Sequence, residues 1–154
     1  MATLGSDPME WTLDDGFVVS TDPARLDLTA IARFLRAAYW SEGVPAEVVE
    51  RSIAHSLPFG LYDPAGVQAG FARVVSDRAV FAYLGDVFVL PAYRGRGLGV
   101  RLVERVLAHP ELQGLRRWHL ATADAHELYR RFGFTEADRP ERHMFLDRSP
   151  ADLY

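Results

Sequence analysis

A glycine-rich turn between an apolar strand and an amphipathic helix constrains this 154-residue chain more than any other stretch. Residues 86–90 (DVFVL) are rich in the Val and Phe that fill a half-buried pleated surface, and Pro91 ends the strand because it cannot donate to the ladder. Three glycines follow at alternate positions in residues 95–99, and the apolar stripe of a helix begins at Leu98. The chain is therefore predicted to form a strand, a turn and a helix in direct succession.

This turn has the features of an anion site. The first N–H groups of a helix have no partner within the helix, and the positive end of the helix dipole lies behind them. The two arginines of the turn add charge and bidentate donors for the same anion. We therefore expect a phosphate group to bind here. The residues expected to form the site are Arg94, Gly95, Arg96, Gly97, Leu98, Gly99 and Val100.

Three phosphate-binding patterns can be compared with the turn. A P-loop needs a lysine after its glycines, and none follows here. A dinucleotide fingerprint needs GxGxxG with a ribose-binding acid downstream, whereas this turn has GxGxG and no such acid. The stretch Arg94-x-x-Gly97-x-Gly99 resembles the R/Q-x-x-G-x-G/A pyrophosphate loop of the GNAT acyl-CoA N-acetyltransferases. The alternative is an exposed Arg-Gly turn that binds nothing.

A second block supports the same family. Residues 120–134 (LATADAHELYRRFGF) resemble its next conserved stretch, in which a strand leads to a short helix carrying Leu-Tyr and then to a Gly-Phe that opens another strand. The resemblance covers about Leu26 to Leu146. It implies the GNAT fold, a mixed α/β (α+β-like) arrangement whose central sheet is mostly antiparallel and has helices on its flanks. In that fold two parallel central strands, here 79–90 and 116–122, splay apart.

The whole chain, 1–154, is expected to form one domain, with residues 1–15 as a loosely ordered lead-in. Hydrophobic periodicity predicts the remaining elements. These are a strand at 16–20, helices at 27–40 and 46–55, strands at 58–62 and 67–75, and the helix that starts at Leu98.

The resemblance implies acetyl-CoA as co-substrate, with its pantetheine arm in the gap between the splayed strands. The main chain of Val87, Phe88 and Val89 is expected to pair with the pantetheine amides. Thr122 stands where many relatives have asparagine, and its hydroxyl could supply a shorter contact to the cofactor. Asp124, with Glu127 three residues later, resembles a capping box and is expected to cap the helix that follows.

The reaction implied is direct attack of a primary amine on the thioester through a tetrahedral intermediate. The acceptor would be a small molecule or a protein amine. Tyr129 matches the tyrosine of the Leu-Tyr block, and as a neutral phenol it could protonate the leaving thiolate. The Val89 N–H is the expected oxyanion donor. The alternative is that Tyr129 only packs between its apolar neighbours.

The proton acceptor is left open by the sequence. Asp86 lies inside an apolar strand beside the reaction point, so it could attract the ammonium substrate or accept its proton through a water. An equally weighted alternative is a structural ion pair with an arginine. Glu42, Asp77 and His126 are weaker candidates.

Three aromatic residues are expected near the acceptor. Tyr39, Trp40 and Tyr83 could form a stacking or cation–π wall for a small amine, although ordinary core packing is the alternative for each. A catalytically degenerate domain that binds CoA as a sensor is the competing function. The presence of both the loop and Tyr129 favours the enzyme.

Composition excludes other classes. The chain has no cysteine, so disulfides and thiolate metal sites are excluded, and we expect no metal. A formal net charge of −4 argues against a nucleic-acid partner. No apolar run approaches the roughly 20 residues of a membrane span, and no signal peptide is evident, so a cytoplasmic location without membrane contact is expected. Some relatives are dimers, and a homodimer is compatible with the sequence. The acceptor and the preferred acyl chain are not determined by it.

Overall fold

Residues 7–154 are described by a computed structural model, in which one six-stranded sheet runs in the order β1-β2-β3-β4-β5-β6. All neighbouring strands are antiparallel except β5 and β6, which are parallel. The strands are β1 (Glu10–Thr12), β2 (Val18–Ser20), β3 (Leu57–Tyr62), β4 (Gln68–Ser76), β5 (Phe81–Val89) and β6 (Arg117–His119). This is the mixed, mostly antiparallel sheet expected from the sequence.

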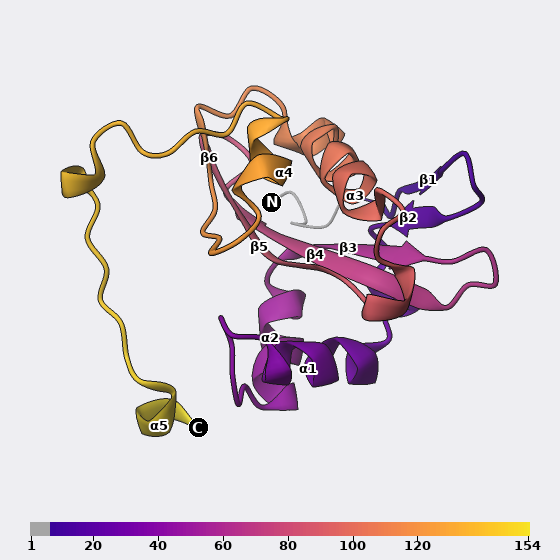
Figure 1. The fold of residues 1–154 in the computed structure, drawn as a ribbon, viewed down its shortest axis with the longest axis horizontal. Coiled ribbons are helices and arrows are strands. Elements are labelled where there is room, and N and C mark those ends of the chain that lie inside the picture. Colours follow the sequence, from indigo (N-terminus) through magenta and orange to yellow (C-terminus); the bar gives the residue numbers. More distant parts are fainter. Residues whose placement is uncertain (1–6) are drawn as a thin grey trace.

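Helices cover both faces of the sheet (Figure 1). On one face lie α1 (Leu28–Ala37) and α2 (Ala46–Ala54), and on the other lie α3 (Leu98–Leu107) and α4 (His126–Arg130). A further short helix, α5 (Pro150–Leu153), follows the long segment after α4. The described part of the chain also contains four 3₁₀ turns: η1 (Pro23–Arg25), η2 (Pro91–Tyr93), η3 (Pro110–Leu112) and η4 (Pro140–Arg142). No helix among residues 7–154 is both long and apolar enough to cross a bilayer.

Each face of the sheet has its own core. Buried residues of α1 and α2 pack with Phe71 and Phe88, whose rings point to that face from β4 and β5. The larger core lies under α3, where Leu98, Leu102 and Val106 are fully buried or nearly so. Asp27 sets the start of α1, because its carboxylate accepts the Ala30 N–H at 3.0 Å. The apolar stripe of each helix therefore faces the sheet, as its amphipathic sequence pattern predicts.

The parallel strands separate beyond their first three residues. The β5–β6 pairing runs from Phe81↔Arg117 to Tyr83↔His119, while β5 continues to Val89. On its other edge β5 carries a bulge, because Phe71 and Arg73 of β4 pair with Phe88 and Gly85. Residues 84–89 therefore have no strand partner on the β6 side, and this is the splayed gap expected of the fold.

The lead-in prediction was partly wrong. Residues 1–6 lie outside the described residues, but Glu10–Thr12 forms β1 at the sheet edge. Trp11 packs against the larger core, and Glu10 forms an ion pair with Arg25. These contacts are long-range in sequence, so local composition does not reveal them.

Two further expectations fail in the region after β6. The strand that Gly133-Phe134 was to open is not formed, and residues 135–139 have no regular structure. Asp124 does not cap α4; instead the Thr122 hydroxyl accepts the Ala125 N–H at 3.0 Å. A strand needs a neighbour to bond to, and none lies beside residues 135–139 in the described chain.

Candidate active site

The glycine turn presents a row of free amides. Gly95 and Gly97 have φ of 81° and 73°, the left-handed region that favours glycine, and no atom lies where a Cβ would be added. Residues 94–97 are exposed, and α3 starts directly after Gly97. Among the described residues, the N–H groups of residues 95–100 donate to no backbone carbonyl. The turn therefore offers an amide-lined surface at a helix N-terminus, with the properties that a diphosphate requires.

The open edge of β5 leads away from this turn. Leu90 donates to the Ala69 carbonyl on β4 at 2.8 Å, so the backbone of Val89 points to the opposite side. There the Nε of Arg94 donates to the Val89 carbonyl at 2.9 Å. This contact joins the turn to the end of β5. The main chain of residues 87–89 borders the splayed gap, because β6 pairs with β5 only at residues 81–83.

Tyr129 of α4 lines the same cavity as Val87 of β5. Its side chain is only 7% exposed and packs edge to face on Phe134, with ring centroids 5.9 Å apart. Burial, with minor contributions from nearby Tyr39 and Asp124, raises the pKa of Tyr129 to about 12. The phenol is therefore neutral near pH 7 and able to donate a proton.

Asp86 is held on both carboxylate oxygens. Arg73 Nε donates to one at 2.9 Å, and Trp40 Nε1 donates to the other at 3.0 Å. Arg73 also donates to the Ser56 hydroxyl at 3.0 Å. Asp86 has a φ of 53° in the β5 bulge, a left-handed conformation that aspartate tolerates better than most residues. The arginine partner is the structural alternative considered for Asp86, and its identity could not be read from the sequence.

The predicted acceptor residues come together around one cavity of about 620 Å³. Tyr39, Trp40 and Tyr83 all line it, and the Tyr39 hydroxyl accepts the Ala123 N–H at 3.0 Å. The apolar part of the wall comes from Leu35, Val44, Val48 and Val49 of the α1–α2 region. The predicted residues Asp86, Val87, Thr122 and Tyr129 also line this cavity.

Other candidates lie elsewhere. Glu42 and Asp77 do not line the cavity, and Asp77 caps a turn by accepting the N–H groups of residues 79–81. These bonds lower the pKa of Asp77. His126 lines a different cavity beside β6. No group of three potential metal-ligating side chains was found among the residues that the structure describes.

Comparison with known proteins decides the family. The acetyltransferase (GNAT) domain family matches residues 57–136, about half of the chain. A Gibberella zeae protein provisionally named an acetyltransferase is 32% identical over 144 residues, covering 79% of this chain and 80% of that protein. This chain belongs to the GNAT acetyltransferase family.

Solved GNAT structures share the fold. A Xanthomonas campestris pv. campestris protein assigned to the GNAT family is 51% identical, with a TM-score of 0.83 over 90% of this chain and 96% of that one. A GNAT family acetyltransferase from Elizabethkingia anophelis, solved with acetyl-CoA bound, is 14% identical and has a TM-score of 0.63, covering 81% of this chain and 80% of that one. The second likeness supports the fold alone.

Proposed function

We propose that this GNAT protein transfers the acetyl group of acetyl-CoA to a primary amine of a small molecule. The observation that supports this most is the continuity of three features along one gap: free amides at residues 95–100, an open β5 edge, and a neutral phenol at Tyr129. They match in order the diphosphate, the pantetheine and the sulfur of acetyl-CoA. Transfer then proceeds by direct attack through a tetrahedral intermediate.

The diphosphate would bind the turn by charge and by hydrogen bonds. The amides of residues 95–100 supply the hydrogen bonds, and Arg94 and Arg96 supply the charge. The exposed backbone edge of Val87 and Val89 would pair with the pantetheine amides as a neighbouring strand does. The Thr122 hydroxyl accepts from Ala125, and its own proton remains available as a donor to the cofactor.

Tyr129 would act as the general acid. A phenol whose pKa is about 12 keeps its proton over the whole working range, so Tyr129 would be in the acid form whenever negative charge develops on the leaving sulfur. The Val89 N–H, on the gap side of β5, would stabilise the oxyanion.

Asp86 would position the acceptor wall rather than accept the proton. Its two oxygens already accept hydrogen bonds from Arg73 and Trp40, and its side chain is 13% exposed. Removing Asp86 would release Trp40 from the sheet and leave the Arg73 guanidinium without its ion pair. We therefore assign Asp86 to holding the α1–α2 loop on the β5 bulge.

The acceptor cavity favours an amine with an apolar or aromatic body. Its wall combines aromatic rings with the aliphatic residues of the α1–α2 region, and its volume of about 620 Å³ is typical of small-ligand sites. A protein amine would have to reach the same cavity with its side chain. The aromatic faces suit a cationic amine before it loses its proton.

The test is thiol release from acetyl-CoA over a panel of amines that includes an arylalkylamine, an aliphatic diamine and a lysine peptide. We expect the arylalkylamine to be acetylated with the highest kcat/KM. If acetyl-CoA raised the melting temperature of the protein but no amine caused thiol release, the protein would be a CoA-binding sensor domain and not an enzyme. Failure of both acetyl-CoA and CoA to stabilise the protein would reject the proposal.

A further inference from the structure

The acceptor cavity contains one charge that its own wall does not balance. Among the described residues that line the cavity, the charged side chains are Arg73, Asp86 and Asp124. Arg73 and Asp86 form an ion pair at 2.9 Å, so their charges neutralise each other. The exposed carboxylate of Asp124 forms no ion pair or hydrogen bond within residues 7–154. The cavity therefore carries one uncompensated negative charge.

The loop that carries Asp124 is anchored on both sides of it. The N–H of Ala123 donates to the Tyr39 hydroxyl at 3.0 Å, which joins the loop to the chain that follows α1. The N–H of Ala125 donates to the Thr122 hydroxyl, also at 3.0 Å. Asp124 lies between these two anchored amides, so its neighbours fix its position while its own carboxylate stays available. A group held in place by its surroundings is suited to binding a ligand.

The structural role predicted for Asp124 is not the one it has. An aspartate just before a helix normally caps the first free N–H groups. Here α4 begins at His126, and no side chain caps it at the N-cap residue, Ala125. Glu127, the second member of the predicted capping box, forms an ion pair with Arg130 at 3.0 Å instead. Capping therefore does not account for the carboxylate of Asp124.

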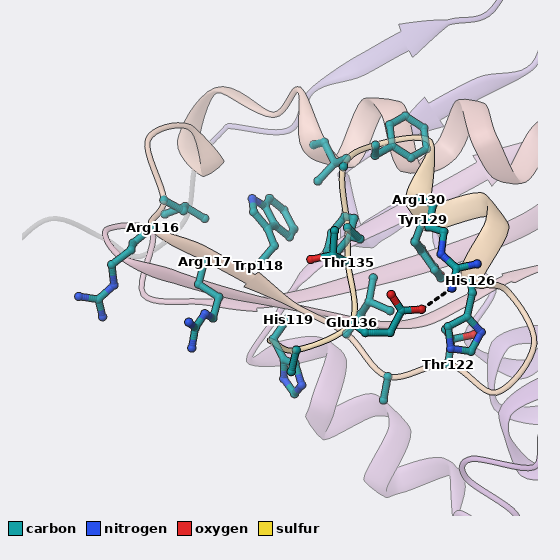
Figure 2. Close-up of a pocket in the computed structure, with 18 of the residues that line it drawn as sticks. Arg116, Arg117, Trp118, His119, Thr122, His126, Tyr129, Arg130, Thr135 and Glu136 are labelled. Carbon is teal, nitrogen blue, oxygen red and sulfur yellow. Dashed lines mark hydrogen bonds and ion pairs between the residues drawn. The ribbon is translucent and has the colours of Figure 1, made fainter. Parts of the chain in front are cut away.

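The basic side chains of α4 lie on the other cavity, beside β6. Figure 2 shows His126 there, and it shows the ion pair between Arg130 and Glu136. Neither His126 nor Arg130 lines the acceptor cavity. In the described part of the chain, Arg73 is the one basic residue that does, and its charge is already paired. The charge of Asp124 therefore remains for a cationic ligand.

Asp124 also lies near the phenol that is proposed to act as the general acid. Asp124 and Tyr129 line the same cavity. Burial is the main cause of the raised pKa of Tyr129, about 12, and the negative charge of Asp124 adds to it, as a nearby carboxylate does. A cation bound at Asp124 would therefore lie close to the Tyr129 hydroxyl and to the sulfur proposed to lie beside it.

The aromatic wall of the cavity suits the same ligand. The rings of Tyr39 and Trp40 meet edge to face with centroids 5.1 Å apart, and the two residues are 59% and 42% exposed. Accessible aromatic faces attract an ammonium group and also cover an apolar body. A carboxylate beside such rings distinguishes a cation from a neutral molecule of the same shape.

We propose that Asp124 binds the ammonium group of the acceptor and thereby selects cationic amines over neutral molecules of the same shape. This role rests on the proposed function, in which the acceptor is an amine. It assigns to Asp124 the recognition of the acceptor charge, whereas Asp86 holds the wall.

The first test is calorimetry on the CoA-loaded protein, where no acetyl group is present to transfer. Phenethylamine is compared with O-benzylhydroxylamine, which has nearly the same shape but an uncharged nitrogen at pH 7. The wild type is expected to bind phenethylamine about tenfold more tightly, the low end for a hydrogen bond to a charged group. Asp124→Asn should bind the two ligands about equally. A wild type without this preference, or an Asp124→Asn variant that retains it, would overturn the proposal.

Two controls exclude a general loss of structure or charge. Asp124→Asn should keep the melting temperature and CoA affinity of the wild type, because the carboxylate has no partner in the described chain. Glu127→Gln removes an exposed carboxylate of α4 that lies outside the acceptor cavity, and it should keep the preference. In the wild type, added salt should weaken the binding of phenethylamine and not that of O-benzylhydroxylamine. Equal salt dependence for both ligands would contradict a charge contact.

The second test is thiol release from acetyl-CoA with the same two amines. Asp124→Asn is expected to raise KM for phenethylamine by about tenfold and to leave KM for O-benzylhydroxylamine unchanged. An ammonium preference in calorimetry that depends on Asp124, without thiol release for either amine, would reject acetyl transfer to them and keep Asp124 as the ammonium site. Thiol release with the same KM values in wild type and Asp124→Asn would reject the role of Asp124 and keep acetyl transfer.

Discussion

The indole Nε1 of Trp40 donates a 3.0 Å hydrogen bond to Asp86, and thereby ties the loop between α1 and α2 to the bulge of β5. The other carboxylate oxygen accepts a hydrogen bond from Arg73, which also donates to the Ser56 hydroxyl. One carboxylate thus joins the acceptor wall to the strand that borders the gap. We take this chain of bonds as the framework of the acceptor site.

Trp40→Phe tests the framework, because it keeps an aromatic ring and removes the donor. A hydrogen bond to a charged group contributes roughly 1.5–3 kcal/mol. Trp40 is partly exposed, so we expect the lower end, a rise of about tenfold in KM for the amine. KM for acetyl-CoA should not change. Steady-state kinetics with each substrate varied in turn would contradict the assignment if both KM values rose together.

Tyr129→Phe tests the proposed general acid. We expect kcat to fall by about 100-fold or more, the usual scale for loss of acid catalysis, while the affinity for CoA measured by calorimetry is retained. Tyr62→Phe is the matched control, because the Tyr62 hydroxyl is also buried but has no hydrogen-bond partner and lies outside both cavities. Equal activity of Tyr129→Phe and wild type would leave Tyr129 a packing residue.

The pH dependence of kcat gives a separate test of the same phenol. Burial raises the pKa of Tyr129 to about 12, so the acid form persists from neutral pH to about pH 10. We therefore expect that ionisation of Tyr129 causes no fall in the kcat of the wild type between pH 7 and pH 10. A falling limb near pH 8 in wild type, absent in Tyr129→Phe, would show that the phenol ionises in the working range.

Gly97→Ala tests the diphosphate turn. A methyl group fits sterically, but φ of 73° is strained for alanine, at a cost of about 1–2 kcal/mol. If the turn relaxes, its amides diverge, and we expect the Kd for CoA to rise by about tenfold. Gly66→Ala, with φ of 87° and equally open space, should lose similar stability without loss of CoA affinity. Unchanged CoA binding in Gly97→Ala would contradict the assigned site.

His109 predicts a pH-dependent stability. Its ring is fully buried, Nδ1 accepts the Glu111 N–H at 3.1 Å, and Nε2 has no partner. Burial lowers the pKa of His109, so the unfolded chain binds the proton more readily than the folded one. The free energy of unfolding should therefore decrease as pH falls below about 6.5, with a limiting slope of about 1.4 kcal/mol per pH unit.

Chemical denaturation at pH 7.5 and 5.5 measures this effect. His109→Gln retains an acceptor for the Glu111 N–H and removes the titrating ring. Its unfolding free energy should depend less on pH over this range. A wild-type protein that is equally stable at both values would contradict the assignment.

What could be predicted from the sequence was local. The strand, turn and helix around Gly97 and the apolar stripe of α1 follow from residue types and periods that act over short distances, whereas the splayed pair of strands was implied by the family resemblance. The turn and Tyr129 also matched family patterns.

What was missed depends on contacts between distant segments. β1 is stabilised because Trp11 packs against the larger core and Glu10 forms an ion pair with Arg25. Both contacts join residues far apart in the sequence, so the local sequence does not predict them. Asp124 does not cap α4 because the helix begins only at His126, later than the capping pattern requires, and the Thr122 hydroxyl accepts the N–H of the preceding Ala125. The strand expected to open at Gly133-Phe134 is not formed, because residues 135–138 make no backbone hydrogen bond to another segment of the described chain.

The most direct test of the central claim is a crystal structure with acetyl-CoA. The account predicts the diphosphate on the amides of residues 95–100, the pantetheine along Val87 and Val89, and the sulfur within hydrogen-bond distance of the Tyr129 hydroxyl. A cofactor bound elsewhere, or a sulfur beyond reach of Tyr129, would contradict the account and leave the protein a GNAT fold without this chemistry.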